Sequence, residues 1–160
     1  MTPAKNRAPR STPTGSLPST TLADAADALF RSAIEACRQH ERVARCSGRG
    51  CTDDELKEMA ELCDLGHRHL AARTVAWEKA AGEGRGESID TFWHAANALW
   101  HASREYARRH HSCDKMTTSV SRRATDALGA LTLEYELEAS ALLALRQAVA
   151  GYRKVRVDAE

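Results

Sequence analysis

The sequence predicts an all-α protein, an antiparallel four-helix bundle (residues 20–156) behind a disordered N-terminal tail (residues 1–19). All four prolines lie within the first 18 residues, so none interrupts the chain from Thr20 onward. Hydrophobic residues make up 42% of the chain and are chiefly Ala and Leu, which favour helix over strand. They recur at three- and four-residue steps in stretches separated by glycine clusters, which is the pattern of amphipathic helices joined by loops.

The tail combines proline, serine and threonine with three basic residues and no acid, and it has too little apolar surface to offset its ordering entropy. The remaining chain holds 20 basic and 22 acidic side chains, so its net charge predicts no general attraction to nucleic acid. No stretch approaches the ~20 consecutive apolar residues of a membrane-spanning helix. We therefore expect a soluble protein that binds neither nucleic acid nor a membrane.

The first helix is expected from about Thr21 to Cys46, because apolar residues recur there on one face. This face includes a thiol and an imidazole, Cys37 and His40. Glycines at positions 48 and 50 predict the loop that ends the helix.

The second helix is expected to begin after Thr52, which forms a capping box with Glu55 three residues later. Its apolar stripe carries Cys63 and Gly66 inward, with His67 beside them. The helix should end at the glycine cluster of residues 82–86.

The third helix is expected from about Ser88 to His111, with His101 at the flank of its apolar face. A break is predicted at residues 111–114, where Ser112 or Asp114 could cap the next helix.

The fourth helix would then run from about Asp114 to Lys154, about 60 Å, whereas the other three would measure about 35–45 Å. Its excess length would carry apolar side chains without intramolecular partners, and Glu138 is the one charged member of its heptad-like register. This predicts self-association, or contact with another protein, through Leu142, Leu145, Val149 and Tyr152.

Antiparallel packing predicts which thiols and imidazoles lie at one depth in the bundle. Counted from the loop end, one internal layer contains Cys37, His40, Cys63, His67 and His101. Thiolate and imidazole are ligands that zinc, copper and iron prefer, so this layer is a candidate site for such an ion or for haem. A second candidate site, at the loop end itself, consists of Cys46, Cys51, His110, His111 and Cys113. The competing interpretation is that the cysteines are small core residues and that the histidines are only hydrogen-bonded.

The five cysteines are odd in number and irregularly spaced, and we expect them to be reduced thiols in the cytoplasm. The sequence contains no phosphate-cradling glycine loop, nucleophile elbow or convincing carboxylate pair, so no catalytic residue is predicted. The preferred hypothesis is a noncatalytic helical module that acts through protein contacts. The alternative is a bundle that binds a transition metal or haem.

Overall fold

The computed structural model describes residues 21–83, 91–120 and 126–157, with the backbone alone for residues 118–120 and 126–128. It contains four α-helices: α1 (Leu22–Arg49), α2 (Asp53–Glu83), α3 (Thr91–Val120) and α4 (Asp126–Val157). Within the described ranges, only residues 21 and 50–52 lie outside a helix, which confirms the predicted all-α class. The predicted tail, residues 1–19, lies outside the described residues.

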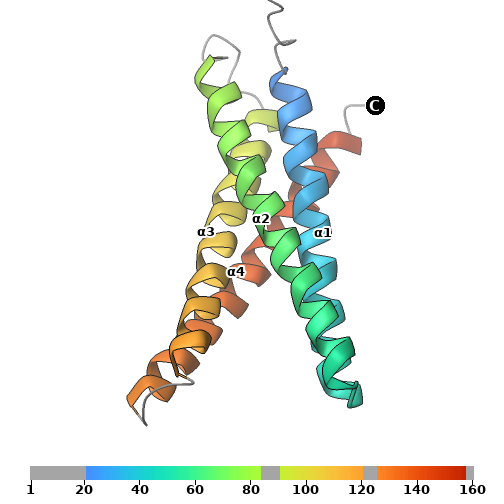
Figure 1. The fold of residues 1–160 in the computed structure, drawn as a ribbon. Helices are drawn as coiled ribbons and strands as arrows, with labels where there is room; N and C mark the ends of the chain where they lie inside the picture. Colours follow the sequence, from blue (N-terminus) through green and yellow to red (C-terminus); the bar gives the residue numbers. More distant parts are fainter. Residues whose placement is uncertain (1–20, 84–90, 121–125, 158–160) are drawn as a thin grey trace, which may run out of the picture.

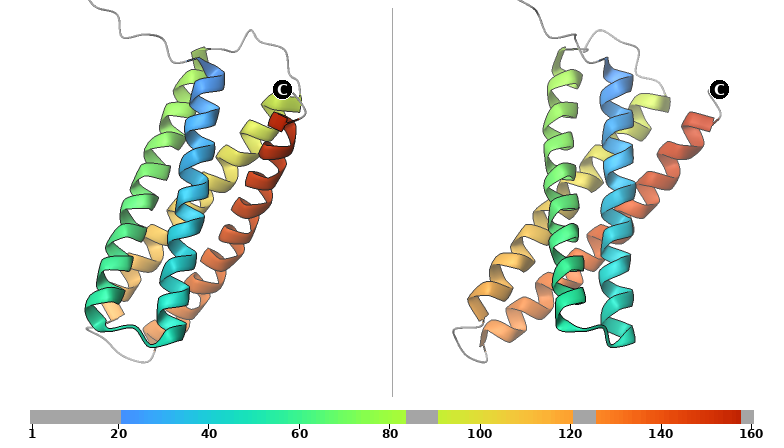
Figure 2. Two further views of the ribbon diagram at one scale, coloured as in Figure 1. Left: turned by 90° about the vertical axis from the view of Figure 1, so that its right-hand side faces the viewer. Right: turned by 45° about the vertical axis from the view of Figure 1, so that its right-hand side comes forward.

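The helices form two antiparallel hairpins, α1–α2 and α3–α4, that cross as the arms of an X (Figures 1 and 2). Packing is most extensive within each hairpin, and α2 and α3 supply the largest share of the contact between the two. The α1–α2 turn lies at the same end of the bundle as the C-terminus of α3, as predicted. At this end, however, the two hairpins splay apart (Figure 1).

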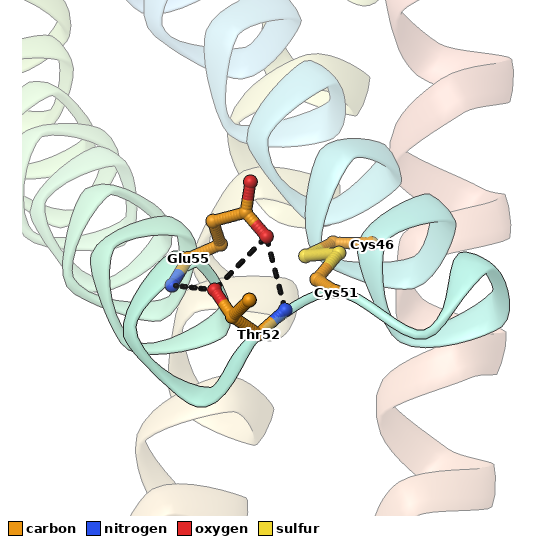
Figure 3. The surroundings of a disulfide bond; sticks show 4 residues. All are labelled: Cys46, Cys51, Thr52 and Glu55. Carbon is orange, nitrogen blue, oxygen red and sulfur yellow. Dashed lines mark hydrogen bonds between the residues drawn. A yellow bond between two sulfur atoms is a disulfide. The ribbon is translucent and has the colours of Figure 1, made fainter.

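The α1–α2 turn contains both features that the sequence predicts there, a loop glycine and a capping box. Gly50 ends α1 in the left-handed conformation (φ 69°), and its N–H donates to the Cys46 carbonyl. Thr52 and Glu55 form the predicted capping box: the Thr52 N–H donates to Glu55 Oε2 at 2.9 Å and the Glu55 N–H donates to Thr52 Oγ1 at 3.3 Å (Figure 3). The turn brings Cys51 back over the end of α1.

Cys46 and Cys51 are joined by a disulfide across this turn, with their Cα atoms 5.4 Å apart (Figure 3). The prediction that all five cysteines are free thiols is therefore wrong for this pair. The left-handed Gly50 reverses the chain within five residues, and spacing along the sequence does not reveal such a reversal. Cys37, Cys63 and Cys113 are free and buried.

Replacement of Thr52 by alanine should lower the free energy of unfolding by about 1 kcal/mol, because the Glu55 amide loses its side-chain acceptor. Thr52→Ser keeps the hydroxyl and should cost less. Denaturant unfolding of the two variants measures the difference, and equal losses would show that the Thr52 hydroxyl contributes nothing to the capping box.

The predicted break at residues 111–114 is wrong, because α3 continues through it to Val120. As a result α4 has 32 residues, close to the 28, 31 and 30 residues of the other helices, and it has no overhang. Three of the four proposed interface residues belong to the bundle core instead: Leu142, Leu145 and Tyr152 are 7%, 0% and 1% exposed. The fourth, Val149, is partly buried and packs against the core. The structural reason for assigning them to an interface is thus removed.

The rest of the core combines small residues with a few large side chains. On α2, a Cβ added at Gly66 would lie 3.7 Å from Gln39 Cγ and 3.8 Å from Ala36 Cα, so α1 and α2 are in close contact there. The largest fully buried side chains include Trp77, Tyr106 and Tyr152. Among the described helices, none has an apolar stretch long enough to cross a membrane.

Candidate metal centre

Three metal-ligating side chains from two facing helices converge near the crossing of the hairpins. Cys63 and His67 lie one turn apart on α2, and His110 comes from α3. One ligand atom from each lies within 4.8 Å of the others, and Cys63 and His67 are buried. We call these residues the donor trio.

His67 presents a nitrogen that lacks a partner. Its Nδ1 lies 2.7 Å from the Cys63 carbonyl oxygen, and because a carbonyl can only accept, Nδ1 must carry the proton. Nε2 then holds a bare lone pair, and it is buried without a hydrogen-bond partner among the described residues. Burial lowers the pKa of His67 to about 4, so the ring is neutral near pH 7. A neutral imidazole fixed by an Nδ1–H···O=C bond is the usual form of a metal-ligating histidine.

His110 lies between two carboxylates. Its Nδ1 is 2.7 Å from Glu138 Oε1 on α4, and its Nε2 is 2.9 Å from Asp64 Oδ1 on α2. Burial alone would lower the pKa of His110, but the hydrogen bonds to Glu138 and Asp64 outweigh it and raise the pKa. The His110 and His67 rings are stacked, with centroids 3.4 Å apart. The pair thus links α2, α3 and α4.

The buried Glu138 carboxylate binds a second group as well. Burial would raise its pKa, but its hydrogen bonds with His110 and with the Cys113 thiol help to lower it. Burial and the nearby acidic groups raise the pKa values of the Cys63 and Cys113 thiols to about 12 each, so both are protonated near pH 7. A bound cation would have to displace those thiol protons.

Tyr106 connects the donor trio to α1. Its ring lies against His67, with centroids 4.7 Å apart, and its hydroxyl is 3.0 Å from His40 Nδ1. Because Tyr106 is fully buried, it fixes both imidazoles in place.

Two pockets border the cluster. One, of about 260 Å³, is lined by residues of all four helices, including His40, Cys63, Cys113 and Glu138. The other, of about 290 Å³, lies between α2 and α3, and His67 is among the residues that line it. Asp64 and His110 line both, so a small ion could reach the donor trio from solvent.

The structure brings together only part of the predicted layer. Cys63 and His67 belong to the donor trio, and His40 lines the pocket beside them. Cys37 is buried elsewhere, within hydrogen-bonding reach of Arg146. The placement of His101 in this layer is wrong: it is exposed, with its ring 4.3 Å from that of Trp100.

His110 takes the place expected for His101 because of the extra length of α3. With the end of α3 moved from residue 111 to Val120, the same depth corresponds to a position nine residues later. The second candidate site does not form: Cys46 and Cys51 are bonded to each other, His110 and Cys113 lie beside Glu138, and His111 is exposed.

Asp64 and Glu138 were not predicted to be partners of a site residue. The sequence carried one signal for Glu138, a charged residue in an apolar register, since a buried carboxylate requires a hydrogen-bonded partner.

Comparison with protein-family models, with curated proteins and with solved structures gave no match. The chemistry of the donor trio is therefore the guide to function.

Proposed function

We propose that this protein binds a transition-metal ion, most suitably Zn²⁺, through Cys63, His67 and His110. The observation that carries the proposal is the buried Nε2 lone pair of His67, which has no partner among the described residues and belongs to a set of three soft donors. In tetrahedral zinc sites neighbouring ligand atoms lie about 3.3–3.8 Å apart, as follows from bond lengths of about 2.0–2.3 Å. The ligand atoms of the donor trio lie within 4.8 Å of one another. To reach this geometry the stacked rings of His67 and His110 would have to turn apart, and His110 Nε2 would have to leave Asp64.

Charge supports a divalent cation at this place. One thiolate and two neutral imidazoles would leave Zn²⁺ with one uncompensated positive charge, and the carboxylates of Asp64 and Glu138 lie beside His110 to balance it. The pockets of about 260 and 290 Å³ fall below the ~300–1,000 Å³ of typical small-molecule sites, which favours an ion over haem. The bound ion would connect the two hairpins where they cross.

Zinc should therefore stabilise the fold. At a free zinc concentration 100 times the Kd, one site that forms only in the folded protein adds about 2.7 kcal/mol, which raises Tm by about 5–10 °C in a domain of this size. The test is calorimetric titration and thermal unfolding of untagged protein in a non-chelating reductant, with and without zinc.

His67→Ala should abolish this stabilisation, and His69→Ala is the matched control, because His69 lies on the same helix and is exposed. A wild-type protein that binds no zinc, or a His67→Ala variant that binds it as tightly as wild type, would refute the proposed site.

Action through protein contacts, the other function expected from the sequence, is a separate proposal that ranks second, because its four anchors in α4 are taken up by the core. A cytoplasmic location is also a proposal. The free thiols Cys37, Cys63 and Cys113 agree with a reducing compartment, and the Cys46–Cys51 bond favours an oxidising one. Alkylation of cells before lysis, followed by mass spectrometry of the Cys46 and Cys51 peptides, distinguishes the two.

A further inference from the structure

We infer that Cys113 is the fourth ligand of this ion, so that α2 and α3 each supply one cysteine and one histidine to a closed Cys₂His₂ site. The inference rests on the proposed zinc site and specifies its coordination. It is carried by the register of the two helices and by a pocket that their cysteines share.

Helices α2 and α3 run antiparallel, and the stacked rings of His67 and His110 place these two residues at one level. Toward the splayed end of the bundle, the residue numbers fall along α2 and rise along α3. One turn in this direction from His67 is Cys63 on α2, and one turn from His110 is Cys113 on α3. The sequence spacings, four residues and three residues, correspond to about 6 Å and 4.5 Å of helix rise. The two cysteines therefore lie at nearly the same level, below the two histidines.

The side chains agree with this register. Cys63, His110 and Cys113 line the same pocket of about 260 Å³. Glu138 Oε1 lies 2.7 Å from His110 Nδ1, and the Glu138 carboxylate is within hydrogen-bonding reach of the Cys113 thiol. The same carboxylate therefore lies beside both Cys113 and a member of the donor trio. Cys113 is 3% exposed, and its thiol would have to turn from Glu138 toward the donor trio to reach the ion.

Coordination by all four residues releases three protons, one each from Cys63, Cys113 and His110. The Cys63 and Cys113 thiols each release H⁺ to solvent as a Zn–S bond forms, and no electron is transferred. His110 would coordinate through Nε2, release the proton it shares with the half-exposed Asp64, and keep its Nδ1–H bond to the buried Glu138. Two thiolates then neutralise Zn²⁺, which a buried site favours. Asp64 is the competing fourth ligand, and in that case the site would contain one thiolate.

Cobalt substitution counts the thiolates. The reduced full-length protein is titrated with Co²⁺, and the sulfur-to-cobalt charge-transfer band in the near ultraviolet reports how many Co–S bonds form. Cys113→Ser and Cys63→Ser should each halve the intensity of this band and weaken cobalt binding by at least about tenfold. Cys37→Ser, which removes a buried free thiol outside the cluster, should leave the band unchanged.

The outcomes separate the two proposals. A wild-type protein without a charge-transfer band would refute the metal site itself. A band that Cys63→Ser abolishes but Cys113→Ser leaves intact would keep the metal site and refute Cys113 as a ligand. Thiol alkylation of the wild-type protein provides a test without substitutions: zinc should protect the Cys63 and Cys113 peptides together, and protection of Cys63 alone would overturn the inference.

Discussion

Leu145→Ala is expected to lower the free energy of unfolding by about 2–5 kcal/mol while leaving the oligomeric mass unchanged. Leu145 is 0% exposed and belongs to the central hydrophobic cluster, so its truncation both removes buried apolar surface and leaves a cavity. Denaturant unfolding measures the loss, and light scattering measures the mass. The combined result distinguishes a core residue from the interface residue that the sequence suggested.

Leu143→Ala is the matched control. It removes the same atoms two residues earlier on α4, but Leu143 is 58% exposed, so we expect a change within about 0.5 kcal/mol. If Leu145→Ala instead formed a smaller oligomer and lost no more stability than Leu143→Ala, Leu145 would be an interface residue.

Local signals in the sequence predicted the first half of the fold well. The Thr52–Glu55 capping box and the glycine at position 50 act within a few residues, and both appear in the structure where they were expected. The Cys46–Cys51 bond at the same turn was missed, because it depends on the path of the chain through the turn rather than on residue type.

The boundary between α3 and α4 could not be predicted from capping residues. Ser112 and Asp114 are good N-caps, but such residues also occur inside helices when tertiary packing favours continuation. Here Cys113 is buried beside Glu138, and Thr117 Oγ1 donates to the Cys113 carbonyl at 2.8 Å and lies 3.0 Å from the Tyr135 hydroxyl on α4. The contacts between α3 and α4 thus outweigh the local signal.

The position of the C-terminus of α3 also determined which residues of the candidate site could be predicted. Cys63 and His67 lie one turn apart on one helix, so the helical period alone places them together. The third member of the donor trio depends on the register between α2 and α3, and an error of nine residues at the end of α3 exchanged His110 for His101. The partner carboxylates, Asp64 and Glu138, follow only from that register.

Glu138→Ala is expected to cost about 3–5 kcal/mol in metal-free protein, the penalty for removing one partner of a buried ionic pair. Glu138 is 5% exposed, its Oε1 lies 2.7 Å from His110 Nδ1, and the Cys113 thiol is within hydrogen-bonding reach of it, so its loss removes a buried acceptor from the core. The Ala variant also creates a cavity at the point where α3 meets α4. Denaturant unfolding in the presence of a chelator measures the loss.

Two comparisons isolate the contribution of the pair. Glu136→Ala removes an exposed carboxylate from the same helix and should change stability by no more than about 0.5 kcal/mol. A double-mutant cycle of Glu138→Ala with His110→Ala should give a coupling energy of about 0.5–3 kcal/mol, because the two side chains are in direct contact. Additive losses would mean that the two residues contribute to the core separately, and Glu138 would then have no part in holding His110 in the orientation that metal binding requires.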